Sequence, residues 1–584
     1  MSLFDTLQRS GALRPVDLAL AHSLQRLDPD ADDAALAAAA LASYAVAQGH
    51  AAFDPAAVAD LVQSSIVWPG LDEWQASLAR CSWVWQAHDD TTSDESAPLV
   101  VEGGRIYLRR YREYECRLAA AMRRLCMAPV APPAEAVDAL HARLFPKHAN
   151  GDAQARAARE ALRHPVLLVT GGPGTGKTTT IARVLLLLVA QAQADGQPAP
   201  RIALAAPTGR AADRMAGSVR RVADALRADG VEPALCDALP TGASTLHRLL
   251  GLLPGHAHAS ADARHPLPLD VLVVDEASMV DLALMCKLVE ALPTGCRLLL
   301  LGDRDQLPSI EAGDVLAALS DAADAMPGNG APLAGCRVHL DRGYRQNEGL
   351  VLDPVTDAVR RGDAIAALAS LRAGTPGVQW HEDVLDPLAG ALRTHLLARW
   401  SALLACREPM AALGLAHQAR LLTALRDGPQ GASQLNARIE LALAGPQREP
   451  YFHGRLLMVT ENSPRHGLFN GDVGVCLREH GTSVTWFNSA DGPRPFHPAA
   501  LPAHVSAFAM TVHKAQGSEF DCVWLQLPAV ETRVLSRELL YTALTRARNE
   551  LHVLGPAASV ENAIARQVRR TSGLAARLGP ERIR

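Results

Sequence analysis

A glycine-rich segment, residues 171–178, constrains the fold of this chain more than any other part of its sequence. It reads Gly-Gly-Pro-Gly-Thr-Gly-Lys-Thr, follows the apolar run at residues 166–169 and precedes a helix-type sequence. This is the P-loop pattern G-x-x-x-x-G-K-[ST] between a strand and a helix, where backbone N–H groups and the helix N-terminus hold phosphate oxygens. A glycine-rich turn without a ligand is the alternative, and the flanking strand and helix favour the phosphate site.

The residues of this loop have distinct predicted roles. Lys177 would reach the β- and γ-phosphates of ATP, and the Thr178 hydroxyl would ligate Mg²⁺. Lysine is rare and arginine abundant in the chain, so a lysine is expected where a compact ammonium group is needed. The other predicted nucleotide contacts of the loop are Gly172, Gly174, Thr175, Gly176 and Thr179.

Two carboxylates follow a second apolar run, at residues 271–274. Asp275 would hold Mg²⁺, largely through water, and Glu276 would act as the general base on the attacking water. A solvated strand end would look similar in isolation. A P-loop in the same α/β unit favours the catalytic interpretation.

Composition narrows the class of protein. The chain has 584 residues, 48% of them hydrophobic, and a formal net charge of −5, so a basic DNA groove would have to be local. Its ten cysteines form no C-x-x-C pair, which disfavours zinc and iron–sulfur sites and favours a reducing compartment. No signal peptide or membrane-spanning run is recognisable. We expect a cytoplasmic protein without a membrane partner.

The chain divides into three predicted parts. Residues 1–131 have helical periodicity, including residues 106–115, and end at a proline-rich linker. Strands and helices alternate over residues 132–335, with a small insert at about 252–268, and again over residues 336–584, starting near residues 337–340. Short β-type runs around Asn470-Gly471 predict a small inserted β-barrel at about 430–500. The fold class is therefore α/β with parallel sheets.

Several motifs resemble those of superfamily 1 helicases. Residues 301–308, which include Gln306, resemble motif III, whose amide responds to the γ-phosphate. Residues 206–212 resemble motif Ia and residues 245–251 the next DNA-contacting motif. The DNA contacts that these two motifs imply are Pro207, Thr208, Arg210, Thr245 and His247.

Further motifs extend the resemblance into the second half of the chain. Gln154 is placed like the glutamine that reads adenine, and Tyr344-Arg345 resembles motif IV, in which the tyrosine stacks on adenine. Residues 541–547 resemble motif VI. The resemblance implies that Arg345 and Arg546 are arginine fingers that reach the γ-phosphate from the second domain.

Residues 511–520 are similar to the V/Va motif of superfamily 1B, whose members move 5′ to 3′ on DNA. The resemblance implies that Thr511, His513 and Lys514 contact the single strand and that Glu519 lies near the nucleotide sugar. The direction of movement is an implication of the family alone, because the chemistry of these side chains does not fix a direction.

Within that superfamily the chain resembles the RecD family, the α subunits of RecBCD-type exodeoxyribonuclease V. The resemblance rests on the amino-acid sequence of residues 171–180, on the turn at residues 467–472 and, more weakly, on residues 107–115. It implies two RecA-like motor domains, an SH3-like insert, DNA ends as substrate, and RecB-like and RecC-like partners in double-strand break repair. The N-terminal region, with tryptophans at 68, 74, 83 and 85, would dock on the partners.

A nuclease site is not expected in this chain. Nucleases of such complexes use a carboxylate-x-Lys element, and no lysine here has an acidic residue two positions earlier. Three other interpretations compete with the motor subunit. They are a stand-alone RecD-like helicase, a regulatory subunit that binds DNA without translocating, and a small-molecule kinase, which would not need the DNA-contacting motifs.

Overall fold

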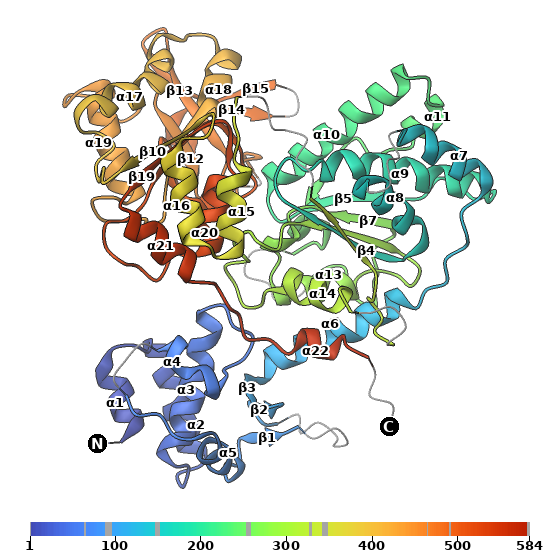
Figure 1. The fold of residues 1–584 in the computed structure, drawn as a ribbon, viewed down its shortest axis with the longest axis vertical. Helices are drawn as coiled ribbons and strands as arrows, with labels where there is room; N and C mark the ends of the chain where they lie inside the picture. The colour runs from blue at the N-terminus through green and yellow to red at the C-terminus, as the bar shows by residue number, and fades with distance from the viewer. Residues whose placement is uncertain are drawn as a thin grey trace.

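A computed structural model describes residues 2–62, 66–87, 96–146, 152–252, 259–325, 330–341, 349–463, 465–489 and 492–580. The predicted Tyr344 and Arg345 lie outside these ranges. Two α/β units, called here the first and second unit, stand side by side above a smaller N-terminal region (Figure 1). Within the described part of the chain, no helix is long and apolar enough to cross a membrane.

The first unit is built on a sheet of six parallel strands in the order β6-β5-β7-β8-β4-β9. Strands β4 and β7, which both have a neighbour on each side, are buried along their whole length, as the continuous apolar runs predict. The strands are β4 (Val166–Gly171), β5 (Ile202–Ala206), β6 (Ser244–Thr245), β7 (Val271–Val274), β8 (Arg297–Gly302) and β9 (Arg337–Leu340).

Helices cover both faces of this sheet, and each face has its own apolar core. One face carries α7 (Glu135–Leu144), α8 (Ala153–Arg163), α9 (Lys177–Ala194), α10 (Gly209–Ala228) and α11 (Pro233–Asp237). The other carries α6 (Arg109–Cys126), α12 (Leu246–Leu249), the 3-10 turn η2 (Ala277–Met279), α13 (Leu282–Glu290) and α14 (Val315–Ala323). Part of the predicted insert, residues 253–258, lies outside the described residues, and residues 259–268 contain no helix or strand.

Strand β9 corrects the predicted start of the second unit. The sequence suggested that residues 337–340 open the second sheet, but β9 pairs with β4 of the first, with His339 opposite Thr170. Thr170 Oγ1 also lies 3.1 Å from His339 Nδ1. An apolar run predicts a strand but does not say which sheet it joins, so the boundary between the units falls after Leu340.

The second unit has five parallel strands in the order β10-β19-β18-β11-β17. The strands are β10 (Val378–Glu382), β11 (Ala419–Thr423), β17 (Ala509–Thr511), β18 (Phe520–Gln526) and β19 (Ala547–Gly555). The helices are α15 (Asp353–Arg361), α16 (Ala364–Ala373), α17 (Gly390–Ala405), α18 (Pro409–Gln418), α19 (Ala432–Ala444), η4 (Val512–Ala515), α20 (Arg537–Leu544) and α21 (Ala557–Ala565).

An antiparallel sheet of five strands is inserted between α19 and β17, in the order β15-β14-β13-β12-β16. It begins later than the predicted residue 430, because α19 belongs to the second unit, where Asn436 Nδ2 donates to Ala509 O at 2.8 Å. The Asn470-Gly471 turn lies in the connection between its first two strands, as predicted. The strands are β12 (Leu456–Val459), β13 (Val473–Glu479), β14 (Thr482–Ser489), β15 (Gly492–Phe496) and β16 (His504–Ser506), with η3 (Pro498–Ala500) before the last.

The N-terminal region is mostly helical, but it also contains a small sheet that the sequence did not predict. The sheet consists of β1 (Val84–Gln86), β2 (Leu99–Glu102) and β3 (Arg105–Leu108). Gly103 and Gly104 have φ values of 57° and 76°, which permits a tight hairpin turn, so the predicted helix at residues 106–115 starts only at Arg109. The helices are α1 (Leu3–Ser10), α2 (Pro15–Leu27), α3 (Asp33–Ala47), η1 (Pro55–Ala57), α4 (Val58–Leu61) and α5 (Leu71–Ala79).

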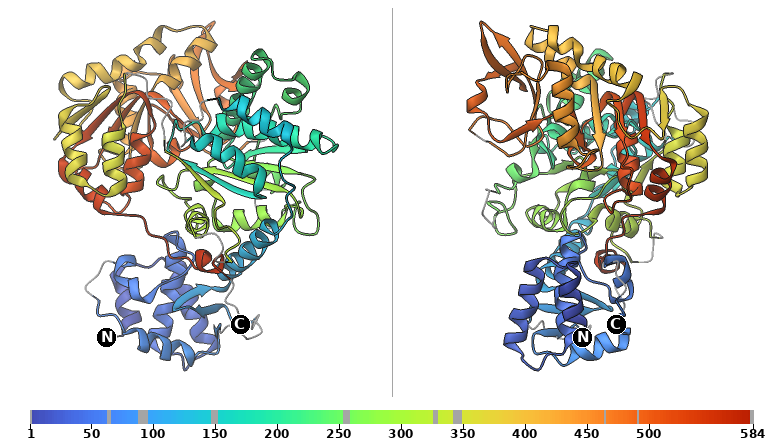
Figure 2. Two further views of the ribbon diagram at one scale, coloured as in Figure 1. Left: turned by 45° about the vertical axis from the view of Figure 1, so that its right-hand side comes forward. Right: turned by 90° about the vertical axis from the view of Figure 1, so that its left-hand side faces the viewer.

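The last described residues, 566–580, form a C-terminal segment that leaves the second unit. It crosses to the N-terminal region and packs its short helix α22 (Leu574–Arg577) against α6 and α14 (Figures 1 and 2). Arg577 pairs there with Glu102 at 2.7 Å and with the buried Glu115 at 3.2 Å. The predicted second part, residues 336–584, is therefore too long at both ends.

Candidate nucleotide site and nucleic-acid interface

The predicted P-loop joins β4 to α9. Gly174 and Gly176 have φ values of 80° and 82°, the left-handed region that favours glycine, and α9 begins at Lys177. The Lys177 ammonium group donates to the carbonyl oxygens of Gly171 at 2.5 Å and Gly172 at 2.9 Å. The loop therefore has the required backbone turns, and its lysine side chain is folded over the loop itself.

Gln154 supports this loop from the first turn of α8. Its Nε2 donates to the Thr175 carbonyl oxygen at 3.0 Å, and the side chain is buried. The residue predicted to read adenine thus lies against the P-loop, where it also fixes the loop backbone.

Asp275 and Glu276 stand at the carboxyl end of β7, beside the P-loop. The Glu276 backbone N–H donates to Asp275 Oδ1 at 2.8 Å, and Glu276 has φ 52°, a costly conformation for a residue other than glycine. Burial, aided by the charge of Glu276, raises the pKa of Asp275. Burial would raise the pKa of Glu276 as well, but the charges of Arg214, Arg546 and Lys177 together outweigh burial, and the pKa is lowered.

A cavity of about 150 Å³, called here the phosphate cavity, lies between these elements. Thr178 and Asp275 both line it and offer the hard oxygen ligands that Mg²⁺ requires, so the residues present fit the ion. Residues of both units contribute to the lining, among them Lys177, Thr178, Thr179, Arg214, Asp275, Glu276, Gln306, Glu519 and Arg546.

Arg546 reaches this cavity from the second unit. It lies just after α20 and is 1% exposed, and its guanidinium donates to Gln306 Oε1 of the first unit at 2.6 Å. Gln306 donates in turn to Asp303 at 3.1 Å, and Asp303 accepts from the Tyr541 hydroxyl of α20 at 3.1 Å. Burial, with the Asp303 charge beside it, raises the pKa of Tyr541, so the phenol keeps its proton as the donor. A series of side-chain hydrogen bonds, from Arg546 through Gln306 and Asp303 to Tyr541, thus joins the two units.

A larger cavity of about 540 Å³ is also lined by residues of the P-loop. Its size lies within the range of sites for small molecules and cofactors. Glu519 lines both cavities. The remaining lining comes mainly from the P-loop, α15, α20 and the start of β19, with Arg360 and Tyr541 among the polar side chains.

The predicted DNA-contacting residues lie at the ends of strands and helices. Thr208, next to Pro207, caps α10 by accepting from the Ala211 N–H at 3.3 Å. Thr245 caps α12, and its strand β6 pairs with the end of β5, directly before Pro207. His247 is exposed in the same helix. The first unit therefore brings these residues to one edge of its sheet.

The second unit contributes the loop after β17. Thr511 caps η4, where His513 is half-buried and Lys514 is exposed. Gly517 lies against Thr208, since a Cβ atom built on Gly517 would stand 3.5 Å from the Thr208 hydroxyl. The two predicted groups of DNA contacts are thus neighbours across the units.

Arg210 also contacts segments from the second half of the chain. Its guanidinium donates to the Gly471 carbonyl oxygen at 3.4 Å and lies 3.2 Å from His417 Nδ1. It therefore links α10 to the inserted sheet and to α18. Burial, together with Arg210, lowers the pKa of His417 to about 3, so His417 is neutral and accepts from Arg210.

Several residues of the site are not among those predicted from the sequence. Asp303 and Tyr541 stand inside the quoted motifs and could have been chosen as polar residues at strand and helix ends. Arg214 stands outside them, one helical turn after Arg210, and only its helical spacing points to it. Its ion pairs connect acidic side chains of the cavity that come from different units.

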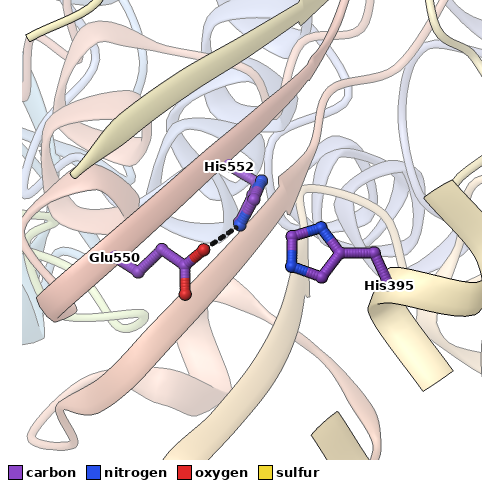
Figure 3. Close-up of side chains that lie close together, drawn as sticks. All are labelled: His395, Glu550 and His552. Carbon is purple, nitrogen blue, oxygen red and sulfur yellow. Dashed lines mark hydrogen bonds and ion pairs between the residues drawn. The ribbon is translucent and has the colours of Figure 1, made fainter. Parts of the chain in front are cut away.

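A second group of potential metal ligands lies in the second unit. Nitrogen and oxygen atoms of His395, Glu550 and His552 lie within 4.8 Å of one another (Figure 3). The Arg399 guanidinium already donates to Glu550 at 2.5 Å and to His395 at 3.1 Å. Because this cation already pairs with two of the three side chains, the cluster is explained as an ion-pair network and not as a metal site.

Three family models match the sequence. The N-terminal domain of the RecBCD enzyme subunit RecD matches residues 9–107, an AAA domain matches residues 154–312 and a UvrD-like helicase C-terminal domain matches residues 506–554. Among solved structures, Bacteroides Pif1 bound to ssDNA aligns with 70% of this chain and 92% of its own at 17% identity and a TM-score of 0.37.

Relatives of known identity cover nearly the whole chain. The RecBCD enzyme subunit RecD of Mycobacterium tuberculosis is 38% identical over 98% of this chain and 96% of its own. That of Haemophilus influenzae is 32% identical over 86% and 84%. The ATP-dependent RecD2 DNA helicase of Deinococcus radiodurans is 32% identical over 82% of this chain but only 59% of its own. This chain belongs to the RecD family of RecBCD-enzyme helicase subunits.

Proposed function

We propose that this chain is an ATP-driven 5′-to-3′ DNA helicase and the motor subunit of a RecBCD-type enzyme in double-strand break repair. The observation that carries the proposal is the phosphate cavity. Lys177 and Glu276 of the first unit face Arg546 of the second across it. An ATP-binding cleft between two α/β units allows nucleotide binding to close the units and hydrolysis to release them.

The chain's own side chains have these proposed roles at the cleft. Lys177 and the P-loop N–H groups bind the phosphates, and Thr178 and Asp275 hold Mg²⁺, which neutralises phosphate charge when bound. Glu276 accepts the proton of the attacking water. Arg546, positioned by Gln306, and Arg345 stabilise charge on the γ-phosphate. Gln154, Tyr344 and Glu519 contact the base and sugar.

Single-stranded DNA would bind along the edge where the two units meet. The contacts proposed are Pro207, Thr208, Arg210, Thr245, His247, Thr511, His513 and Lys514. The 5′-to-3′ direction follows from the family. Because phosphate contacts release counterions, binding should weaken as salt rises.

The parts of the chain have corresponding proposed roles. The two units are RecA-like motor domains, the antiparallel sheet is an SH3-like insert, and the N-terminal region docks on RecB-like and RecC-like subunits in the cytoplasm. Because Trp74 and Trp83 are buried within that region, docking would use other side chains than these two. The stand-alone form is disfavoured, since the mycobacterial RecD subunit is 38% identical to this chain and the RecD2 helicase 32%.

Steady-state ATP hydrolysis by the full chain, with and without single-stranded DNA, tests the proposal. We expect hydrolysis to require DNA, and duplexes with a 5′ single-stranded tail to be unwound. Unwinding from the 3′ tail alone would refute the direction. An ATP hydrolysis rate that is the same with and without DNA would refute the proposed motor function.

A further inference from the structure

Arg214 of α10 bridges two carboxylates that belong to different units. It donates to Glu276 Oε1 of the first unit at 2.6 Å and to Glu519 Oε1 of the second at 3.3 Å. Glu519 also accepts from Arg548 at 3.0 Å. The Glu276 and Glu519 side chains are 12% and 7% exposed, so both pairs are poorly screened by water. The shorter contact is with Glu276.

This bridge conflicts with the proposed role of Glu276. A general base must have a free oxygen lone pair within hydrogen-bond reach of the attacking water. Here a guanidinium occupies one carboxylate oxygen, and its positive charge opposes proton transfer to the other. Glu276 can work at full efficiency only after Arg214 has moved away.

The two sides of the bridge are both tied to predicted DNA contacts. Arg214 lies one turn after Arg210 on the same face of α10, and that helix starts at the Thr208 cap. Glu519 lies two residues after Gly517, where an added Cβ atom would stand 3.5 Å from the Thr208 hydroxyl. Single-stranded DNA that contacts both the start of α10 and the loop after β17 would therefore change the position of α10 relative to Glu519.

We propose that Arg214 is a positioning residue that couples DNA binding to ATP hydrolysis. In the DNA-free protein it pairs with Glu276 and suppresses hydrolysis. DNA bound along α10 and the loop after β17 shifts Arg214 to Glu519 and frees Glu276. The inference rests on the proposed ATPase function and names the side chains that make hydrolysis depend on DNA.

The first experiment compares ATP turnover with and without saturating single-stranded DNA. We expect R214Q to raise the DNA-free turnover about tenfold or more, the order expected for losing one charge-assisted hydrogen bond, and to change the DNA-saturated turnover less than about twofold. R214K, which keeps a charge, should retain a low DNA-free rate. R227Q on the same helix removes only surface ion pairs and serves as the matched control.

Two results would overturn the proposal. Lower turnover of R214Q with and without DNA would make Arg214 a phosphate ligand, and unchanged turnover in both would make it a structural ion pair. A wild-type chain without DNA-stimulated hydrolysis would instead count against the proposed function, so the two failures are distinguishable.

The second experiment needs no nucleotide. Coupling between two sites is reciprocal. Breaking the Arg214–Glu276 pair, which is favoured without DNA, should therefore tighten DNA binding. Breaking the Arg214–Glu519 pair, which is favoured with DNA bound, should weaken it. In fluorescence anisotropy with labelled oligo-dT, we expect E276Q to lower the Kd and E519Q to raise it, each about fivefold. Both changes should vanish in the R214Q background. If E276Q and E519Q each change the Kd by the same factor with and without R214Q, the bridge is not the coupling element.

Discussion

At the scale of single residues, Lys177 of the P-loop gives the first prediction. Its side chain lines the phosphate cavity, and its ammonium group donates to two P-loop carbonyl oxygens. We expect Lys177→Ala to lower DNA-stimulated ATP turnover by about 100-fold or more, since a preorganised charge at the transferring phosphate is lost. Lys287→Ala on α13, which lines neither cavity, is the control. Comparable turnover in both variants would contradict the assignment.

Glu276 allows a complementary prediction. Glu276→Gln keeps the shape of the side chain but cannot take a proton, so it should retain ATP binding and lose about 10²- to 10⁴-fold in turnover. Equilibrium binding of a fluorescent ATP analogue, measured beside hydrolysis, separates the two effects. Loss of binding together with turnover would show that Glu276 supports the fold of the cavity instead of the chemistry.

Residue types at strand ends explain why most of the candidate site could be predicted. The P-loop, Asp275 and Gln306 each follow an apolar run, and parallel strands bring their carboxyl ends to one edge. Arg214 could not be predicted in this way, because its function depends on a partner, Glu519, from the other unit. Tyr344 and Arg345 stay predictions, since they lie outside the described residues.

At the scale of elements, the sequence identified strands better than it assigned them to sheets. The apolar runs that form β4 and β7 were both recognised. Strand β9 was placed in the wrong sheet, because pairing between strands depends on contacts distant in sequence. The hairpin of β2 and β3 was missed, because most of β3 was included in the helix predicted at residues 106–115, which starts only at Arg109.

The C-terminal segment holds the N-terminal region to the first unit through Arg577. Its partner Glu115 is fully buried and also accepts from the Ser572 hydroxyl at 2.7 Å. We expect Arg577→Ala to destabilise the fold by about 3 kcal/mol, because a buried carboxylate loses its cation. Thermal unfolding of this variant beside the exposed Arg569→Ala tests it. Equal unfolding temperatures for the two variants would contradict the role of the pair.

Strand β19 gives a prediction about pH. His552 is fully buried and lies 2.8 Å from Glu550, and burial lowers its pKa to about 4 although Glu550 opposes the shift. The unfolded chain binds this proton near pH 6.5 and the folded chain only near pH 4. Stability should therefore be constant above about pH 6.5 and fall between there and pH 4. His552→Gln should flatten this part of the profile of unfolding temperature against pH. An unchanged slope would assign the effect to other groups.

At the scale of the whole molecule, the N-terminal region and the first unit are joined through α6. Leu118, Met122 and Leu125 of this helix are buried in the same apolar core as α13 and α14. Helix α6 was predicted as part of a separate docking domain of residues 1–131. It is instead a structural helix of the first unit, so a cut through the linker near residue 131 would remove part of the motor's core.

A cut before α6 separates docking from motor function. We expect a chain lacking residues 2–108 to keep most of its DNA-dependent ATP hydrolysis, because both cavities are lined only by later residues. It should fail to co-purify with the RecB-like and RecC-like subunits. A chain lacking residues 2–130 should lose hydrolysis as well, since several large apolar side chains leave a packed core at a cost of about 2–5 kcal/mol each. The full chain, co-expressed with the same partners, is the control. If the shorter deletion still assembled stoichiometrically, docking would belong to the motor units, and if the longer one hydrolysed ATP normally, α6 would not be part of their core.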